Sequence, residues 1–359
     1  MIPVYQTWIT DLEKKYVNQA LDSGWVGSIG EFIERFEEAF AAWLGVKYAV
    51  AVNTGTAACH LALAANGLGT GDEVIIPDTT FIATANAAKY CGCDVATLDI
   101  SRETWNLDED KLNAFVGPKT KAVFCMHAYG NMCDMDKLSS VCLRNNLLLI
   151  EDACEALGGR WNGRLAGSLS KTAAISFHGG KTITTGEGGM VVTNDSDVAG
   201  LARILKGQGQ TDRYYHPVVG YNYRMTNVQA AMGLAQLERI PTILAEKQRV
   251  FERYERRLGG SVTWQKKHPQ SRHAMWVISI AVSNPGDLAE HLRSKQIDSR
   301  ACFVPLSKMP PYRDARGATN CSNSNWLRSS GIVLPSYPQL TDGQIDMICN
   351  KVLEHVEKQ

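Results

Sequence analysis

Between residues 48 and 195, short apolar runs alternate with longer stretches whose apolar residues recur at helical spacing. The runs at 48–52 (YAVAV), 73–77 (EVIIP) and 147–152 (LLLIED) are apolar at successive positions, which indicates strands buried on both faces. Such strands, separated by helices, are typical of a mainly parallel sheet with helices on both sides. The sequence therefore predicts an α/β domain.

The segments on either side of this region predict further helices. Residues 11–43 have apolar positions at helical spacing, interrupted by the turn SGWVGSIG, so two helices joined by a loop are expected. Another long helical stretch follows Asn227, and Pro241 predicts a break or kink within it. Such a stretch commonly leads from one domain into the next, and we expect a large domain over residues 1–240, with the N-terminal segment included.

The remaining chain predicts a small C-terminal α+β domain over residues 241–359. It contains an apolar strand at 276–283 and an amphipathic helix at 342–356. Between them, residues 307–331 are rich in Pro, Ser, Asn and Gly and too long for an ordinary connection. We expect this segment to be an irregular loop that is either disordered or functional.

Charge and cysteine content exclude several classes of protein. Lys plus Arg equals Asp plus Glu, 37 against 37, so no net field attracts nucleic acid or an anionic membrane, and an anionic ligand needs a local site. The ten cysteines form no C-x-x-C pair or zinc-spaced array, which favours buried free thiols and no metal site. No apolar run approaches the length of about 18 residues that a membrane span needs, and the N-terminus lacks a leader pattern. We expect a soluble protein of the reducing cytoplasm.

The densest chemical signal is the glycine-rich stretch at residues 174–195 (AISFHGGKTITTGEGGMVVTND). Gly180, Lys181 and Thr182 match the end of a P-loop, but that motif requires glycine where Ile175 stands. A nucleoside-triphosphate loop is therefore excluded. A second interpretation makes Lys181 a Schiff-base lysine, with the glycines letting the backbone approach a flat cofactor. Considered alone, Lys181 could equally be an ordinary surface lysine.

Schiff-base chemistry on a pyridine cofactor also requires a carboxylate and an anion site. Asp152 ends an apolar strand, where it could keep a pyridine nitrogen protonated, although a helix N-cap is an equal alternative. The run AVAVNTGTAACH reads as strand, tight turn and helix, so the N–H groups of Gly55, Thr56 and Ala57 would converge on a phosphate. A plain capped helix is the alternative, and Ser176 could add a hydroxyl donor.

Five ordered motifs together resemble the sugar aminotransferases of the DegT/DnrJ/EryC1/StrS family. They are Asn53-Thr54-Gly55-Thr56, PDTTFIATANA at 77–87, EDACEALG at 151–158, SFHGGKTITTGEGGM at 176–190 and GYNYRMTNVQAAMGLAQLE at 220–238. The resemblance extends from IPVYQ near the N-terminus to LPSYPQLTDGQI near the C-terminus. It implies the fold-type I scaffold of aspartate aminotransferase, with a mostly parallel mixed sheet in the large domain, and the cofactor pyridoxal 5′-phosphate.

The resemblance implies roles in catalysis for particular residues. Lys181 matches the Schiff-base lysine, which also moves a proton between cofactor and substrate, and Asp152 matches the partner of the pyridinium. Phe81 matches the aromatic residue that stacks on the ring, although the residue pattern alone favours a core position. Glu155 falls where the family places a polar residue near the ring and its hydroxyl.

Phosphate binding and assembly follow from the same resemblance. Gly55, Thr56 and Ser176 match phosphate ligands. Asn222 matches an asparagine that reaches the phosphate from the neighbouring subunit, whereas the residue pattern alone favours a turn leading into a capped helix. The resemblance therefore implies a homodimer with shared active sites.

The resemblance also implies the reaction. TTGEGGM is similar to the branch that aminates C4 of nucleotide-linked 4-keto-6-deoxyhexoses with L-glutamate as amino donor, a step of dideoxy amino sugar and polysaccharide biosynthesis. The nucleotide stays open among GDP, UDP and dTDP. The alternatives are an aminotransferase acting on another keto sugar or a cyclitol, and a non-catalytic nucleotide-sugar-binding member of the family. Lys181 and Asp152 weigh against the last.

A few residues near the expected sugar pocket bear on the substrate. His178 and Ser307 stand where close relatives usually have phenylalanine and histidine. Arg213, Arg224 and Arg300 are candidates for holding the diphosphate, with solvated or packing arginines as the alternative.

Overall fold

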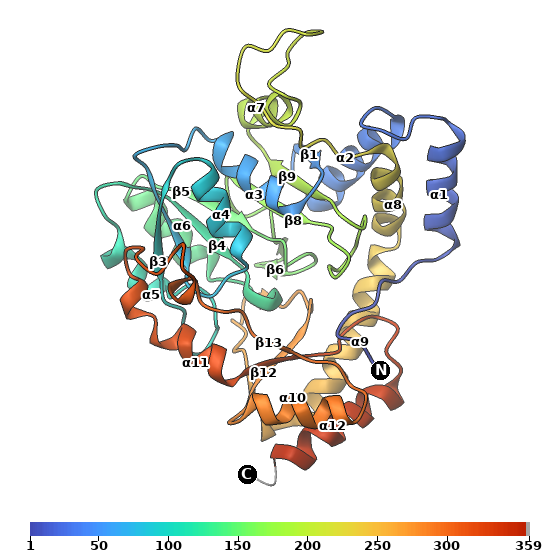
Figure 1. The fold of residues 1–359 in the computed structure, drawn as a ribbon, viewed down its shortest axis with the longest axis vertical. Helices are drawn as coiled ribbons and strands as arrows, with labels where there is room; N and C mark the ends of the chain where they lie inside the picture. Colours follow the sequence, from blue (N-terminus) through green and yellow to red (C-terminus); the bar gives the residue numbers. More distant parts are fainter. Residues whose placement is uncertain (357–359) are drawn as a thin grey trace.

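A seven-stranded sheet forms the centre of the molecule (Figure 1). The computed structural model describes residues 1–356. The strands are β1 (Tyr48–Val52), β2 (Glu73–Pro77), β3 (Asp94–Leu98), β4 (Thr120–Met126), β5 (Leu148–Asp152), β8 (Thr172–Ser176) and β9 (Gly189–Thr193). In the order β1-β9-β8-β5-β4-β2-β3, the last five are parallel, whereas β9 is antiparallel to both neighbours. This mostly parallel mixed sheet confirms the predicted α/β class.

Helices cover both faces of this sheet. They are α1 (Asp11–Asp22), α2 (Glu31–Leu44), α3 (Gly55–Ala64), α4 (Ile82–Tyr90), α5 (Glu109–Phe115), α6 (Met135–Arg144), α7 (Ser196–Lys206) and α8 (Asn227–Glu238). Successive strand residues point to opposite faces, so Val50 and Ile76 pack with α3, α4 and α7, whereas Ala51 and Ile75 pack with α2, α6 and α8. Burial of both faces is the reason that the strands read as continuous apolar runs.

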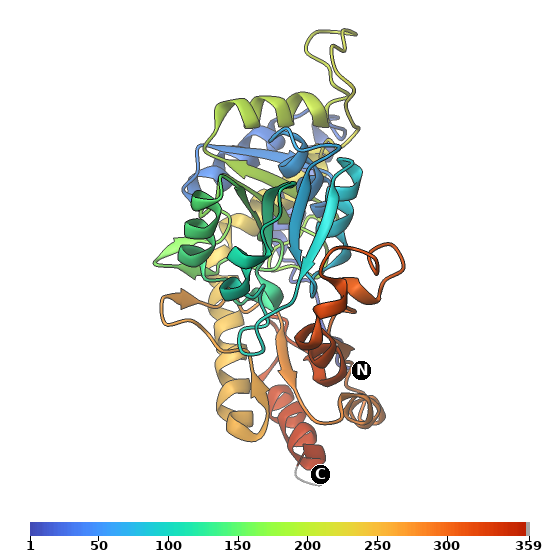
Figure 2. The same cartoon turned by 90° about the vertical axis from the view of Figure 1, so that its left-hand side faces the viewer.

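A second, antiparallel sheet lies in the C-terminal part. It consists of β10 (Thr263–Trp264), β12 (Ile278–Ala281), β14 (Gly331–Leu334) and β13 (Arg300–Ala301), in that spatial order. Helices α9 (Ile240–Leu258), α10 (Pro285–Ser294) and α12 (Asp342–Val356) share its apolar cluster. Figure 2 shows these elements at the opposite end of the molecule from α7. Pro241 lies in the first turn of α9, so the predicted break falls between α8 and α9.

Two further contacts join distant segments. A small sheet pairs β11 (Ser271–Arg272) with β6 (Arg160–Trp161), which pairs in turn with β7 (Arg164–Leu165). At the N-terminus, Ile2 forms a bridge with Ile297. The division of the chain at residues 240 and 241 stays a prediction.

The expectation of an irregular loop at residues 307–331 was wrong. The segment contains the short helical turns η3 (Leu306–Lys308) and η4 (Ala318–Asn320) and the helix α11 (Ser322–Ser330). The Asp99 carboxylate accepts the N–H groups of Asn323 and Ser324 and the hydroxyl of Ser324, each at 2.9 Å. Since Asp99 follows β3, the cap of α11 comes from another part of the chain and leaves no local signal.

All ten cysteines are free and none is fully exposed, which confirms the expectation of unpaired thiols. Within residues 1–356, no helix combines the length and the apolar character that a membrane crossing requires.

Candidate active site

The sequence motifs meet at one edge of the large sheet. Asp152 is the last residue of β5 and Ser176 the last of β8, while Gly55 begins α3 shortly after β1. These three strands run in the same direction, so their carboxyl ends share the edge at which open α/β sheets bind ligands. Lys181 lies in the connection between β8 and β9.

The turn from β1 into α3 has the geometry of an anion cradle. Thr54 caps α3 by accepting the N–H of Ala57 at 3.0 Å, which leaves the N–H groups of Gly55 and Thr56 as the first donors of the helix. A Cβ on Gly55 would lie 2.7 Å from the hydroxyl oxygen of Ser176. Glycine is therefore needed for this close approach, and the predicted ligands Gly55, Thr56 and Ser176 do lie together.

Asp152 is buried at the end of β5 and is held by short polar contacts. Its Oδ2 accepts the hydroxyl of Thr84 at 2.6 Å, and its Oδ1 accepts the N–H of Cys154 at 3.1 Å. A turn rather than a helix follows β5, so the alternative of a helix N-cap was wrong. Thr84 and Cys154 thus orient the Asp152 carboxylate, which caps no helix.

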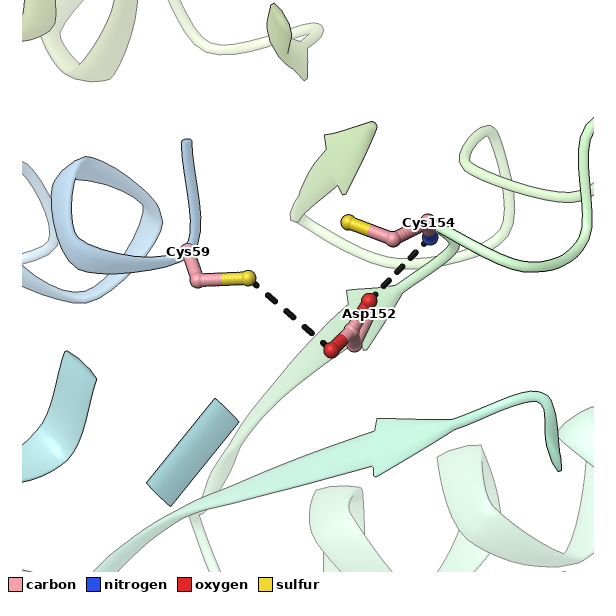
Figure 3. A group of neighbouring side chains, drawn as sticks. All are labelled: Cys59, Asp152 and Cys154. Carbon is pink, nitrogen blue, oxygen red and sulfur yellow. Dashed lines mark hydrogen bonds between the residues drawn. The ribbon is translucent and has the colours of Figure 1, made fainter. Parts of the chain in front are cut away.

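Two thiols flank this carboxylate (Figure 3). The Sγ of Cys59 lies 3.9 Å from Oδ2 of Asp152, and the ligand atoms of Cys59, Asp152 and Cys154 all lie within 4.8 Å of one another. The contact with Cys59 and burial raise the pKa of the Cys154 thiol well above its ordinary value. The Cys59 thiol is thus a weak donor to Asp152, whereas the Cys154 thiol lies 3.7 Å from the carbonyl oxygen of Ala174.

Lys181 and Glu155 contact each other within the site. Lys181 Nζ lies 3.5 Å from Oε1 of Glu155 and 3.9 Å from the ring centroid of Trp276. Glu155 Oε2 accepts the N–H of Tyr129 at 3.0 Å, whereas Oε1 has no hydrogen-bond partner within the described chain. Burial raises the pKa of Glu155 to about 7, against the opposing charge of Lys181. With 14% of its side chain exposed, Lys181 is no ordinary surface lysine.

Phe81 is an exposed aromatic residue at the start of α4. Its relative exposure is 52%, so the core position that the residue pattern favoured was wrong. Its ring approaches that of Phe303 at 6.0 Å between centroids. The N–H of Thr84 bonds to the Phe81 carbonyl, and the Thr84 hydroxyl bonds to Asp152, so Phe81 lies one helical turn from a direct ligand of that carboxylate.

Asn222 lies on the segment between α7 and α8. Its side-chain oxygen accepts a bond from Arg224 at 3.3 Å, and its carbonyl accepts one from the side chain of Asn53 at 3.3 Å. Asn222 therefore lies beside Asn53, which precedes the Thr54 cap of α3. Its reach into a neighbouring subunit stays a prediction.

The two residues near the expected sugar pocket, His178 and Ser307, occupy different settings. His178 is half exposed, with Nδ1 accepting the N–H of Gly180 at 3.3 Å and Nε2 3.8 Å from Glu187. Ser307 donates its N–H and its hydroxyl to the buried carboxylate of Asp78, at 2.8 and 2.9 Å. Ser307 therefore anchors η3 to the end of β2.

Three residues of the site were not found from the sequence. Trp276 contacts Lys181, Tyr129 donates to Glu155, and Thr84 donates to Asp152. Thr84 lies inside PDTTFIATANA, which could have drawn attention to it. Trp276 and Tyr129 come from segments without a motif and reach the site only through folding.

These residues fit pyridoxal 5′-phosphate, the cofactor that the resemblance implied. The cradle at Gly55 supplies N–H donors for a phosphate, and Asp152 is a buried carboxylate of the kind that pairs with a pyridinium. Oε1 of Glu155 has no hydrogen-bond partner within the described chain and lies 3.5 Å from Lys181 Nζ. A half-exposed aromatic face, Phe81, completes a set suited to a flat anionic ring.

Comparison with known proteins agrees with this geometry. Residues 8–353 match the DegT/DnrJ/EryC1/StrS aminotransferase family. The chain is 45% identical to a GDP-perosamine synthase of Caulobacter vibrioides, over 94% of this chain and 93% of that protein, and 41% identical to one of Escherichia coli O157:H7, over 98% of both. The solved structure of S. venezuelae DesV superposes with a TM-score of 0.93 at 30% identity, over 96% of this chain and 94% of that chain. The chain belongs to the DegT/DnrJ/EryC1/StrS aminotransferase family.

Proposed function

We propose that this aminotransferase moves the amino group of L-glutamate to the C4 ketone of a GDP-linked 4-keto-6-deoxyhexose, with pyridoxal 5′-phosphate as cofactor. The observation that carries the proposal is the buried contact between Lys181 and Glu155 at the sheet edge that also holds Asp152 and the anion cradle. The sequence left the nucleotide open, and the 45% and 41% identity to GDP-perosamine synthases favours GDP. Such a product belongs to dideoxy amino sugar and polysaccharide biosynthesis, and we propose that it forms in the cytoplasm.

The cofactor, when bound, supplies an electron sink for the electron pair left on a substrate carbon when that carbon loses its proton. In this proposal Lys181 Nζ takes and returns the proton of that step, and the contact with Trp276 and Glu155 confines the amine. The Asp152 carboxylate would stabilise the protonated form of the pyridine nitrogen. The N–H groups of Gly55 and Thr56 hold the phosphate, together with the Ser176 hydroxyl.

We further propose a homodimer with shared active sites. Two groups of large apolar side chains are exposed: Trp25, Val26 and Ile29 between α1 and α2, and Tyr214, Tyr215, Val218 and Val219 on the segment that carries Asn222. In Figures 1 and 2 the second segment projects beyond α7, away from the rest of the chain. An isologous contact between two copies would cover such surfaces.

Complementation tests the shared site. A mixture of the Lys181→Ala and Asn222→Ala variants, unfolded and refolded together, should regain activity if each site takes Lys181 from one chain and Asn222 from the other. Each variant refolded alone is the control, and sedimentation gives the assembly state. Absence of regained activity in a confirmed mixed dimer would contradict the shared site.

The reaction is tested in two stages with the purified holoenzyme. Glutamate alone should bleach the visible absorption band of the cofactor, and the keto sugar should then restore it. GDP-, UDP- and dTDP-linked 4-keto-6-deoxyhexoses are compared by product mass, and the GDP form is expected to react fastest. A band that persists with glutamate contradicts transamination. Inactivity with all three sugars would favour an aminotransferase that acts on a cyclitol, or a non-catalytic binding protein. Lys181→Ala is the control and should lack activity.

A further inference from the structure

Lys247 occupies a core position of α9. It lies on the buried stripe formed by Ile243, Val250 and Tyr254, with a relative exposure of 6%, and no carboxylate pairs with it among residues 1–356. Burial lowers the pKa of Lys247 to about 8, so the amine is still mainly protonated at neutral pH. A buried cation is costly unless it is hydrogen-bonded, so the partners of this amine indicate its purpose.

Those partners are two backbone carbonyls from separate segments. Lys247 Nζ donates to the carbonyl of Trp276 at 3.0 Å and to that of Ser336 at 3.1 Å. Trp276 immediately precedes the β12 region, and Ser336 follows β14. Ser336 is itself fixed, because its N–H donates to the Val4 carbonyl. Lys247 thus ties the backbone at Trp276 to the second sheet and to α9.

The tie leads directly to the catalytic amine. The indole N–H of Trp276 donates to the carbonyl of Gly180 at 2.9 Å, and its ring centroid lies 3.9 Å from Lys181 Nζ. Lys181 and Lys247 also line one small cavity of about 30 Å³. Trp276 is therefore held at two points. Lys247 holds its backbone carbonyl, and the loop that carries Lys181 holds its indole N–H.

We propose that Lys247 is a positioning residue that holds Trp276 against Lys181. A lysine side chain is flexible, and fixing a wall of its pocket restricts the amine to fewer positions. A proton-transfer group that is held in its reactive geometry reacts faster than one that samples many geometries. The inference rests on the proposed role of Lys181 and adds that part of its reactivity is set from α9.

The test compares Lys247→Met, which keeps the length of the side chain without a donor, with Trp276→Phe and the double variant. We expect each single variant to lower kcat about tenfold, with an unchanged KM for the sugar, because only the geometry of the amine is disturbed. The kcat of the double variant should be no lower than that of the less active single variant, because both changes break the same connection. Lys295→Met, on an exposed lysine, is the matched control and should be unchanged.

A second readout does not depend on turnover. Apoprotein is mixed with pyridoxal 5′-phosphate, and the rate at which the visible band develops is measured. Lys247→Met and Trp276→Phe should slow this rate about tenfold, whereas a purely structural role would lower the unfolding midpoint and leave the rate unchanged. If Lys247→Met does not fold, Lys247→Gln replaces it, and Trp276→Phe tests the indole contact independently.

The outcomes separate this inference from the proposed function. Losses that multiply in the double variant, or an unchanged kcat and rate of band development in Trp276→Phe, overturn the inference. Aminotransferase activity that survives Lys181→Ala overturns the role of Lys181 itself, whatever the other variants do.

Discussion

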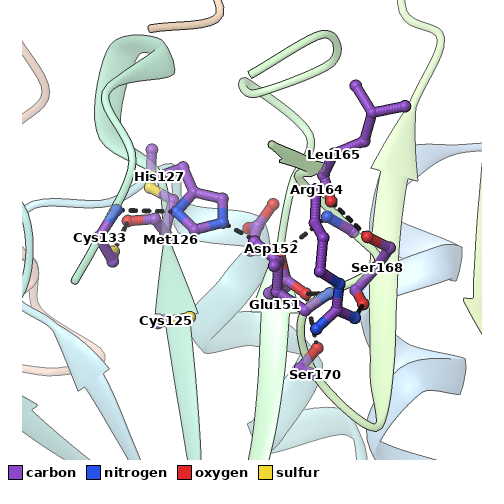
Figure 4. Close-up of polar contacts among 12 residues, drawn as sticks. Cys125, Met126, His127, Cys133, Glu151, Asp152, Arg164, Leu165, Ser168 and Ser170 are labelled. Carbon is purple, nitrogen blue, oxygen red and sulfur yellow. Dashed lines mark hydrogen bonds and ion pairs between the residues drawn. The ribbon is translucent and has the colours of Figure 1, made fainter. Parts of the chain in front are cut away.

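Compared with Glu155, Glu151 is a carboxylate with every acceptor site engaged. It lies in β5 and is fully buried. Figure 4 shows Glu151 between His127, which follows β4, and Ser170, which lies between β7 and β8. The donors are the N–H groups of Gly167 and Leu169 at 2.8 and 2.9 Å, the Ser170 hydroxyl at 2.8 Å and Nε2 of His127 at 3.2 Å. Burial alone would raise the pKa of Glu151, but these donors outweigh it and hold the pKa below its ordinary value.

Glu155 is equally buried but receives one hydrogen bond, from the N–H of Tyr129. Its free oxygen lies 3.5 Å from Lys181 Nζ, and burial raises the pKa of Glu155 to about 7. The difference between the two glutamates is therefore the number of donors, since burial is the same. A fully bonded carboxylate holds the fold together, and an underbonded one retains capacity for a ligand and for a proton.

The largest effect should come from breaking the closed network. Glu151→Gln replaces one acceptor oxygen with a donor group that would face N–H or O–H donors, so we expect the free energy of unfolding to fall by about 3 kcal/mol. Urea unfolding of the apoprotein measures it, and Glu38→Gln, at an exposed position of α2, is the matched control. A loss no larger than that of the control would show that the four bonds contribute little.

A smaller effect on stability, but a direct effect on catalysis, is expected at the open site. Glu155→Gln keeps an acceptor for the N–H of Tyr129 and removes the ionisable group next to Lys181. We expect kcat to fall about tenfold near neutral pH. The wild-type pH–rate profile should contain an ionisation near 7 that the variant lacks. Identical pH–rate profiles of the wild type and the variant would show that the ionisation of Glu155 plays no part in catalysis.

The smallest effect is a difference in the pH dependence of stability. Glu155 has a folded pKa of about 7, above its ordinary value of 4.5, so its contribution to stability is present below pH 4.5 and is lost as the pH rises to about 7. Glu151 has the opposite sign, because a lowered pKa stabilises the fold above pH 4.5 and the contribution is lost on acidification.

Urea unfolding of the apoprotein at two pH values checks this sign. Relative to wild type, Glu155→Gln should be more stable at about pH 8 than at about pH 5, because glutamine has no charge to bury. A difference between the two proteins that stays constant with pH would contradict the raised pKa.

The elements and motifs were accessible from the sequence because their causes are local. Continuous apolar runs predicted β1, β2 and β5, and the turn NTGT predicted the start of α3. The same local reasoning failed for α11, whose cap is Asp99 from the large sheet, and for Phe81, whose apolar neighbours suggested burial.

The sequence alone determined the fold class, the family and the candidates Lys181 and Asp152. The reason is that apolar strand patterns and glycine-rich motifs are made of residues that are close in the sequence. It did not separate Glu151 from Glu155, which stand in the same motif. Only the tertiary structure decided that Glu151 is surrounded by donors and that Glu155 meets Lys181. It alone brought Trp276 to the Lys181 amine and Lys247 to the backbone of Trp276. The physical reason is that a carboxylate or an amine takes its chemistry from the groups within a few ångströms, and in this protein those groups come from distant parts of the chain.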